Sequence, residues 1–309
     1  MYKTIEILKL KRSGVKFMVI QWFPGHMAKA TREVKEKLKL VDIVFELVDA
    51  RCPLSSHNMY LDEVVKDKKK IIIFNKIDLC DRAETTKWKN YFENKGYTVV
   101  YTDAKNSNNL NKVIDKAKEE LAEKIARQVA KGIKPRAIRS MVIGVPNVGK
   151  STFINKLIKK NVANTANKPG VTKKQQWLKL NKDIELLDTP GILMPKFDNQ
   201  EIGKKLSLIG SIKDDITPLD DVSLYLIELL KGNYLENLNN LYKINVNSDD
   251  ENVFIMEKVA EKRFKKIGGD YDYDSTIKLL IQDFRTQKFG LITLDNYNDL
   301  LENEEQNEN

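Results

Sequence analysis

The sequence predicts an α/β chain: a doubly wound, mostly parallel sheet followed by an all-α C-terminal domain. Short apolar runs alternate with helical stretches as far as about residue 194. The run at 70–74 is continuously apolar, and 43–48 is short and β-rich, as in strands buried on both faces. Beyond residue 194, helical patterns replace the strand-like runs. We therefore expect a sheet domain at 18–200 and a helical domain at 201–290.

The first expected elements are a turn and a helix. A turn at 21–27 leads into a helix whose apolar positions, Met27, Val34, Leu38 and Val41, recur at helical spacing. Expected strands then alternate with helices, ending in two paired strands before the helical domain. The expected strands are 43–48, 70–74, 98–101, 140–143, 176–180 and 183–187; the expected helices are 113–129, 152–159, 222–231, 253–266 and 275–288.

The ends of the chain and of its last helix carry separate signals. Asp274 or Ser275 can cap the last helix, and Gly290 can close it. Residues 291–309 form an acidic tail that we expect to be disordered. Residues 1–17 form a basic extension with no evident partner, so we expect Met18 to be the biological start.

Composition narrows the class of partner. Lysine and arginine outnumber aspartate and glutamate 53 to 44 in 309 residues, a formal charge of +9. Such an excess favours phosphate-rich partners, and the alternative is an ordinary solvated basic surface. Cys52 and Cys80 have no metal or redox spacing and are interpreted as thiols of a reducing compartment. No apolar run reaches membrane length, so we expect a cytoplasmic protein without a membrane partner. We also expect a monomer.

A phosphate-binding loop is predicted at 144–151, with the sequence Gly-Val-Pro-Asn-Val-Gly-Lys-Ser between a strand and a helix. Gly144 and Gly149 let the backbone approach phosphates closely, so that N–H groups and the helix N-terminus face the anion. Lys150 would meet the β- and γ-phosphates, and Ser151 would bind Mg²⁺. The nucleotide-binding residues expected here are Asn147, Val148, Gly149, Lys150, Ser151 and Thr152.

A second motif, Asn75-Lys76-Ile77-Asp78, selects guanine. The Asp78 carboxylate can accept hydrogen bonds from guanine N1–H and the 2-amino group, a pair of donors that adenine lacks. Asn75 and Lys76 would brace the base and its loops. Residues 102–105, Thr-Asp-Ala-Lys, resemble the weaker motif that contacts the guanine carbonyl through Asp103 and Ala104, although Asp103 stands where serine is usual. Together the two loops predict GTP and GDP as ligands.

The switch residues are expected in two further segments. In Asp188-Thr189-Pro190-Gly191, Asp188 would hold Mg²⁺ through water and the Gly191 N–H would meet the γ-phosphate. Thr172, in Pro-Gly-Val-Thr, is the candidate that closes over Mg²⁺ in the triphosphate state, and its alternative is a plain loop residue.

Hydrolysis needs a residue that this sequence does not place in the usual position. Ile192 follows Gly191 where a Ras-like enzyme carries the glutamine that orients water. His26 is the candidate substitute, and its alternative is a helix cap or turn residue. The other expected catalytic residues are Lys150, Thr172 and Gly191. Asn147 can help to bind K⁺ beside the nucleotide, or it is a polar loop residue.

The guanine motif precedes the phosphate loop, which reverses the usual order. The chain therefore resembles circularly permuted P-loop GTPases. Residues 21–30, Gln-Trp-Phe-Pro-Gly-His-Met-Ala-Lys-Ala, make it similar to the ribosome biogenesis GTPase A family, also called YlqF. The resemblance implies an assembly factor in late maturation of the large ribosomal subunit, which binds ribosomal RNA and hydrolyses GTP on ribosome stimulation. It also favours a catalytic His26 and a K⁺ preference.

Two classes of function remain open. The first is a GTP-dependent assembly switch, and its basic clusters at 124–139, 173–174 and 262–266 would meet RNA phosphates. Each cluster alone is more often a solvated face. The alternative is a GTPase coupled to another RNA-related process, such as RNA modification or translation, for which the sequence shows no methyl-transfer, folate or nucleophilic-cysteine signature.

Overall fold

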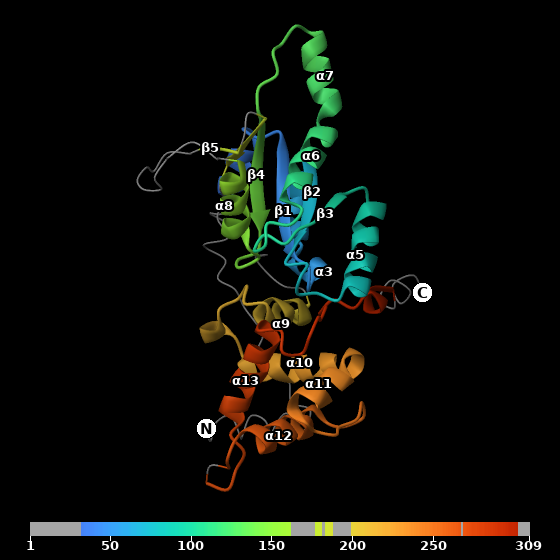
Figure 1. Ribbon diagram of the computed structural model, residues 1–309, viewed down its shortest axis with the longest axis vertical. Coiled ribbons are helices and arrows are strands. Elements are labelled where there is room, and N and C mark those ends of the chain that lie inside the picture. The colour runs from blue at the N-terminus through green and yellow to red at the C-terminus, as the bar shows by residue number, and fades with distance from the viewer. Residues whose placement is uncertain (1–31, 162–176, 181–182, 188–198, 267, 302–309) are drawn as a thin grey trace. The chain divides into compact units, whose positions relative to one another are not determined.

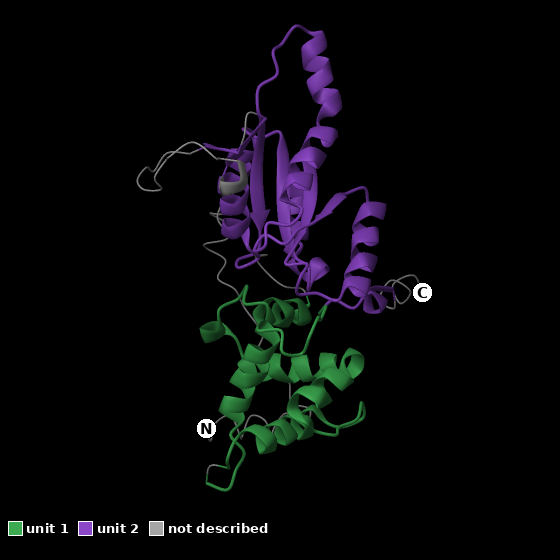
Figure 2. Ribbon diagram, viewed as in Figure 1, with its two compact units in different colours: residues 1–21, 197–294 green, residues 22–196, 295–309 purple. Residues whose placement is uncertain are grey.

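The chain folds into two compact units. A computed structural model describes residues 32–161, 177–180, 183–187, 199–266 and 268–301. The sheet unit comprises residues 22–196 and 295–309, and the helical unit comprises residues 1–21 and 197–294 (Figure 2). The chain therefore leaves the sheet unit, forms the helices and then returns.

The sheet unit is built on six strands in the order β3-β2-β1-β4-β6-β5 (Figure 1). All neighbouring pairs are parallel except the edge pair β5 and β6. This confirms the predicted mostly parallel sheet and the predicted pairing of the last two strands. The strands are β1 (Ile43–Asp49), β2 (Lys69–Asn75), β3 (Thr98–Tyr101), β4 (Ile138–Gly144), β5 (Trp177–Lys179) and β6 (Ile184–Leu187).

Helices alternate with these strands and cover the sheet. Helices α6 and α8 pack beside each other against β2, β3 and β4, while α3 contacts both β1 and α5. A helix over residues 32–38 buries Val34 and Leu38. The other helices of this unit are α3 (Pro53–Ser56), α4 (Met59–Val65), α5 (Arg82–Asn94), α6 (Leu110–Glu120), α7 (Ala122–Ala130) and α8 (Lys150–Asn161).

The core beside α5 is aromatic. Trp88 and Phe92 of α5 pack with Val48 of β1 and with Ile72 and Phe74 of β2, all nearly inaccessible to water. Asp81 begins α5, because its carboxylate accepts hydrogen bonds from the N–H groups of Ala83 and Glu84. Burial of this face holds α5 against the sheet and places the loop before it, residues 75–81, at the sheet's carboxyl edge.

The start of the predicted acidic tail differs from the expectation. Residues 297–301 are helical, Asp295 is buried, and Tyr297 and Leu300 pack against the aromatic core of the sheet unit. The indole N–H of Trp88 donates to the Asp295 carbonyl at 2.8 Å, and the Asp295 carboxylate accepts from Ser55 N–H and Oγ at 2.9 and 2.6 Å. Tyr297 also packs against the rings of Trp88 and Tyr91. The acidic composition of the region gives no sign of this packing. We name residues 295–301 the C-terminal strap.

The helical unit is organised around α10, which packs against α9, α11, α12 and α13. Arg285 closes it on one side: its guanidinium pairs with Asp214 at 2.7 Å and donates to the carbonyls of Ser207 and Leu208. This satisfies the Leu208 carbonyl at the end of α9 and adds a bond to the Ser207 carbonyl, which also accepts from the Gly210 N–H. Its helices are α9 (Gln200–Leu208), a 3₁₀ turn (Asp214–Ile216), α10 (Leu219–Asn233), α11 (Leu235–Tyr242), α12 (Asn252–Arg263) and α13 (Tyr273–Arg285).

Two predicted helix ends need correction. Asp272 caps α13 through a hydrogen bond from Ser275 N–H, instead of Asp274 or Ser275 acting as the cap. The helix stops at Arg285, and Gln287 takes a positive φ of 62°, so Gly290 lies beyond its end. In the described part of the chain, no helix has both the length and the apolar character needed to cross a membrane.

Candidate nucleotide site

The predicted nucleotide motifs gather at one edge of the sheet. Since β1, β2, β3 and β4 are parallel, their carboxyl ends lie together, where ligands bind in open α/β sheets. Residues 49–51 follow β1, the guanine motif 75–78 follows β2, 102–105 follow β3, and the phosphate loop 144–151 follows β4. Segments far apart in sequence therefore form one site.

Asn75 joins three of these loops. Its amide nitrogen donates to the Val148 carbonyl of the phosphate loop at 2.8 Å. Its amide oxygen accepts from Thr102 Oγ1 at 3.2 Å and from the Ala104 N–H at 3.1 Å. The side chain is buried, so these bonds replace water and fix the phosphate loop against the base-binding loops.

Lys76 adds a second connection. Its ammonium donates to the Asn147 carbonyl at 2.8 Å and pairs with the Asp49 carboxylate at 2.9 Å. Lys76 and Asn147 have φ values of 60° and 58°, which non-glycine residues adopt at some energetic cost. The two strained residues are thus bonded to each other across the site.

The phosphate loop requires glycine at two positions. A Cβ on Gly144, whose φ is 148°, would lie 2.4 Å from the Leu47 carbonyl oxygen. A Cβ on Gly149, whose φ is 102°, would lie 2.5 Å from the Asn75 amide nitrogen. Neither position has room for a side chain, so both glycines are needed for the loop to pass β1 and Asn75.

The helix after the loop presents its first turn to the site. Helix α8 begins at Lys150, whose ammonium donates to the carbonyls of Gly144 and Val145 at 3.0 and 2.8 Å. Ser151 and Thr152 follow it and are exposed. A helix N-terminus with exposed hydroxyls and a lysine over the loop can hold a phosphate group.

Asp103 makes local contacts in the loop after β3, and its predicted contact with guanine stays a prediction. Its carboxylate accepts hydrogen bonds from the N–H and side-chain amide of Asn106, at 3.0 and 2.5 Å, so it closes its own loop. Ala104 instead faces the site through the bond from its N–H to Asn75. Asp78 is half-buried next to them.

Asp49 and Arg51 are site residues to which the motif analysis assigns no role. Asp49 is fully buried, and its carboxylate accepts two bonds from the Arg51 guanidinium, both at 2.9 Å, besides pairing with Lys76. Burial alone raises the pKa of Asp49, but the charges of Arg51 and Lys76 outweigh it and hold that pKa well below its ordinary range. In the sequence, Asp49 and Arg51 are marked by their opposite charges at the end of a buried strand.

The remaining predicted site residues, His26, Thr172, Asp188 and Gly191, lie outside the described residues, as does Ile192. The structure therefore brings together the guanine motif, residues 102–105 and the phosphate loop. The predicted roles of the two switch segments and of His26 stay predictions.

Comparisons with known proteins agree with this geometry. The 50S ribosome-binding GTPase family matches residues 139–258, and the RsgA GTPase family matches residues 40–198, which span the guanine motif and then the phosphate loop. Ribosome biogenesis GTPase A of Bacillus licheniformis is 47% identical over 92% of this chain and 100% of its own length. The protein of the same name from Priestia megaterium is 46% identical, covering 90% and 97%. The crystal structure of GNP-bound YlqF from T. maritima matches with a TM-score of 0.59 and 28% identity, covering 87% of this chain and 98% of that one.

Proposed function

The chain belongs to the ribosome biogenesis GTPase A family, and we propose that it is a GTP hydrolase that acts as an assembly factor in late maturation of the large ribosomal subunit. The observation that carries the nucleotide part is the set of bonds from Asn75, which join the guanine motif to the phosphate loop and to residues 102–104. Ribosome assembly is supported by the names of relatives that match nearly the whole chain.

In this proposal each described loop has a separate task. Asp78 reads the guanine edge, and Ala104 contacts it from the loop after β3. Backbone N–H groups of residues 147–152 surround the phosphates, and Lys150 exchanges its bonds to the Gly144 and Val145 carbonyls for the β- and γ-phosphates. Positioning and neutralisation of phosphate charge supply most of the catalysis in such enzymes.

GTPases generally use Mg²⁺, and the described residues fit it in part. Ser151 offers an exposed hydroxyl at the start of α8, the hard oxygen ligand that Mg²⁺ prefers. We propose that Thr172 and Asp188 complete the site and that Gly191 senses the γ-phosphate. The ion would neutralise phosphate charge during transfer. For K⁺, we propose that Asn147 contributes: it is exposed, and its strained backbone is held by Lys76.

We propose that His26 orients the attacking water, because Ile192 has no polar group for that purpose. A neutral imidazole can accept a proton or a hydrogen bond from water.

The partner that stimulates the reaction is the large subunit, whose RNA suits a chain with formal charge +9. We further propose that the protein acts as a monomer in the cytoplasm.

The test is GTP turnover with and without purified large subunits, for the wild type and His26→Ala, in K⁺ and Na⁺ buffers. We expect strong stimulation by subunits in K⁺, lost in His26→Ala while labelled GDP still binds. His26→Gln is the matched control, because glutamine orients the attacking water in Ras-like enzymes, and it should retain part of the stimulated turnover. Absence of stimulation by every subunit preparation would contradict the assembly role, and equal rates in K⁺ and Na⁺ would contradict the proposed role of Asn147.

A further inference from the structure

An arm of residues 125–135 extends from the sheet unit without being needed to connect its elements. On one side of the arm, the Lys124 ammonium pairs with the Asp42 carboxylate at 2.8 Å. On the other side, Arg136 pairs with the same carboxylate at 2.8 Å, and the Arg139 N–H donates to it at 2.9 Å. The chain thus leaves the sheet unit and returns to it beside the same residue, Asp42. A much shorter loop would join α6 to β4.

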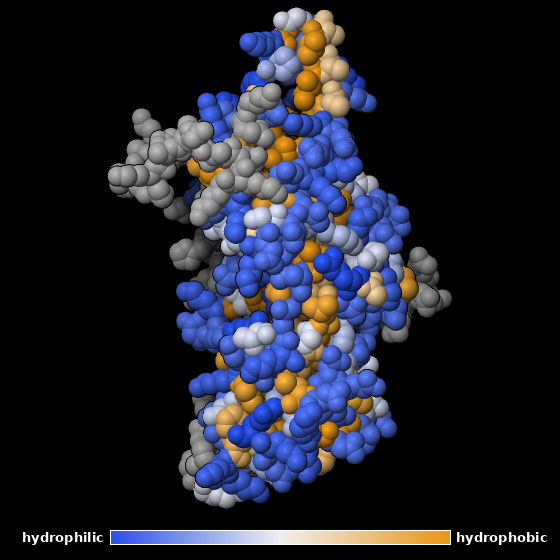
Figure 3. Space-filling model, viewed as in Figure 1, coloured by the Kyte–Doolittle hydropathy of each residue, from blue (hydrophilic) through white to orange (hydrophobic). Residues whose placement is uncertain are grey.

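The arm has little support from the fold. Helix α7, which forms most of it, contains no buried residue and extends past the end of the sheet (Figure 1). Val129 and Ile133 are 54% and 52% exposed, and apolar atoms lie on the surface of α7 in Figure 3. An isolated helix of this length is marginally stable in water, so the arm is suited to gain its stability from a partner.

The charge of the arm indicates which partner. Residues 125–135 contain Arg127, Lys131 and Lys134 and no acidic residue. Arg127 pairs with Glu123 at 3.2 Å, but both side chains are about four-fifths exposed, at 79% and 87%, so this bond is weak. Lys131 and Lys134 make no ion pair with any residue that the structure describes.

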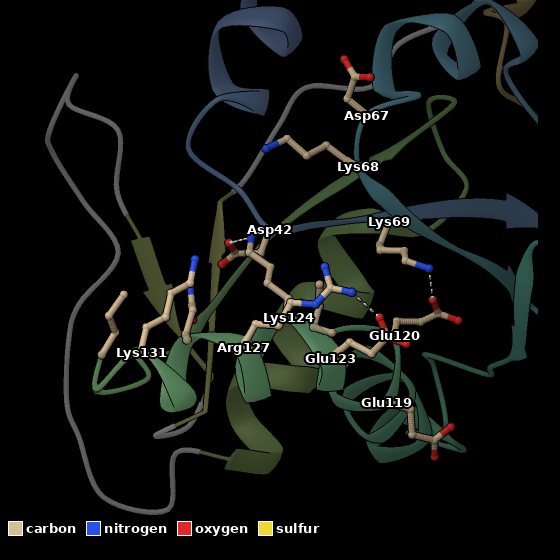
Figure 4. Close-up of a pocket in the computed structure, with 13 residues that line it drawn as sticks. Asp42, Asp67, Lys68, Lys69, Glu119, Glu120, Glu123, Lys124, Arg127 and Lys131 are labelled. Atoms are coloured by element: carbon tan, nitrogen blue, oxygen red, sulfur yellow. Dashed lines mark hydrogen bonds and ion pairs between the residues drawn. The ribbon is translucent and has the colours of Figure 1, made fainter.

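The groove at the base of the arm has a different character. It encloses about 720 Å³, and Arg127, Lys131 and Ile133 of the arm form one part of its wall (Figure 4). The rest of the wall mixes cations with acids: Lys68, Lys69, Lys124, Asp42, Asp67, Glu119, Glu120 and Glu123. Two ion pairs join residues of this mixed wall, Lys69 with Glu120 at 3.2 Å and Lys124 with Asp42 at 2.8 Å. The excess of positive charge therefore belongs to the arm, and the ion pairs of the groove hold the arm's base in place.

We propose that this arm is a docking element for ribosomal RNA, an inference that rests on the proposed function and assigns a surface to it. Arg127, Lys131 and Lys134 would contact phosphates, and Val129 and Ile133 would pack against sugars. A protein partner is less favoured because lysine is depleted in the centres of protein interfaces, whereas cations without acids complement a phosphate backbone.

The position of the arm separates its role from nucleotide chemistry. Asp42 directly precedes β1, and Arg139 lies near the start of β4, so the arm is attached at the amino ends of the strands. The nucleotide loops follow the carboxyl ends of the same strands. Substitutions in the arm should therefore leave basal GTP turnover unchanged, which also serves as the check that each variant folds.

The experiment compares R127Q/K131Q/K134Q with the charge-matched control K66Q/K87Q/K89Q, whose lysines lie at the end of α4 and on α5. Sedimentation with purified large subunits is measured at a series of KCl concentrations. We expect the arm variant to bind at least tenfold more weakly at low salt. The slope of log affinity against log salt should be smaller in magnitude than that of the wild type by about two. Each lost phosphate contact lowers the magnitude of this slope by about 0.7–0.9. The control should keep the wild-type slope.

Other outcomes overturn the inference in distinct ways. If the arm variant retains the wild-type affinity and slope, the arm is not an RNA contact, and the assembly role is unaffected. If V129S/I133S loses binding to the large subunit while R127Q/K131Q/K134Q does not, the partner of the arm is a protein. If the wild type itself neither binds nor responds to subunits, the proposed function fails, and the inference fails with it.

Discussion

At the scale of single residues, the charged side chains buried in the sheet unit determine its geometry. Asp49 holds Arg51 and Lys76 together beneath the base-binding loop. A second network surrounds His57, whose Nδ1 lies 3.0 Å from Glu46 and whose Nε2 lies 2.9 Å from Asp62. Lys70 pairs with both acids, and its ammonium lies over the Tyr97 ring, so these carboxylates are already neutralised by protein cations.

The first prediction concerns Asp49→Asn. Removing this charge leaves the Arg51 guanidinium, which is 4% exposed, without its carboxylate, and such a change typically costs about 3–5 kcal/mol. We expect the free energy of unfolding in urea to fall by about that amount. Asp115→Asn, the same change at an exposed position of α6, is the control and should stay within about 0.5 kcal/mol of the wild type. Equal stabilities of the two variants would show that the Asp49 network contributes little.

The second prediction is a pH dependence from His57. Burial lowers its pKa, but the Glu46 charge and the bonds to Asp62 and Glu46 raise it to about 9. Because this value exceeds the ordinary 6.5, charged His57 stabilises the fold fully below pH 6.5, and the stabilisation is lost as pH rises through 9. The advantage of the wild type over His57→Gln should therefore shrink between pH 6 and pH 10, by at most about 3 kcal/mol. Urea unfolding of both proteins at the two pH values checks this, and a constant difference would contradict it.

Residue roles differ in how far the sequence predicts them. The guanine motif and the phosphate loop are predictable because their chemistry dictates residue type, spacing and position after a strand. The role of Asp49 depends on its pairing with Lys76, and that of His57 on its contacts with Glu46 and Asp62. Pairing of this kind is decided by the fold. Asp103 shows the converse: Asn106 and Asn108 occupy its carboxylate locally, and neither is part of the motif.

At the scale of elements, the phosphate loop depends on its close approach to β1. We predict that Gly144→Ala destabilises the protein by about 3 kcal/mol, because the added Cβ would collide with the Leu47 carbonyl oxygen at 2.4 Å. Gly96→Ala is the matched control: its φ is also positive, at 85°, but nothing lies within 4 Å of the added atom. The control should lose only about 1 kcal/mol from the backbone preference. Urea unfolding compares them, and equal losses would rule out the steric explanation.

The strands follow the predictions more closely than the helices do. Buried parallel strands need continuous apolar runs, so β2 and β3 begin and end within a residue of their expected bounds. The expected helix 113–129 instead divides into α6 and α7 at Leu121. Helices α9 and α11 are not among the expected helices, and both are tied to distant segments. Arg285 donates to the Ser207 carbonyl of α9, and Asn237 of α11 donates to the Phe289 carbonyl.

At the scale of the whole molecule, the C-terminal strap makes the sheet unit discontinuous in sequence. Residues 295–301 pack on Trp88 and Tyr91 after the chain has formed the entire helical unit. The acidic composition of this region predicts a solvated tail, and the burial of Asp295 and the packing of Tyr297 explain why the strap folds instead.

We predict that truncation after Leu294 exposes Trp88 to water. In a W22F/W177F background, Trp88 is the only tryptophan, and its emission should shift to longer wavelength. The thermal midpoint should fall by about 5 °C, as expected for the loss of about 2 kcal/mol. Truncation after Leu301 keeps the strap and is the control. If the emission spectrum of the protein truncated after Leu294 is unchanged, the strap does not cover Trp88.

The strap also imposes an order on synthesis. A growing chain presents β1, β2 and α5 early, but the residues that cover Trp88 emerge only after helices α9 to α13 have been made. Domains usually fold as units while the chain emerges, the N-terminal part first. Until residues 295–301 have been made, the strap cannot cover Trp88, so we expect this aromatic face of the nascent chain to be accessible to chaperones.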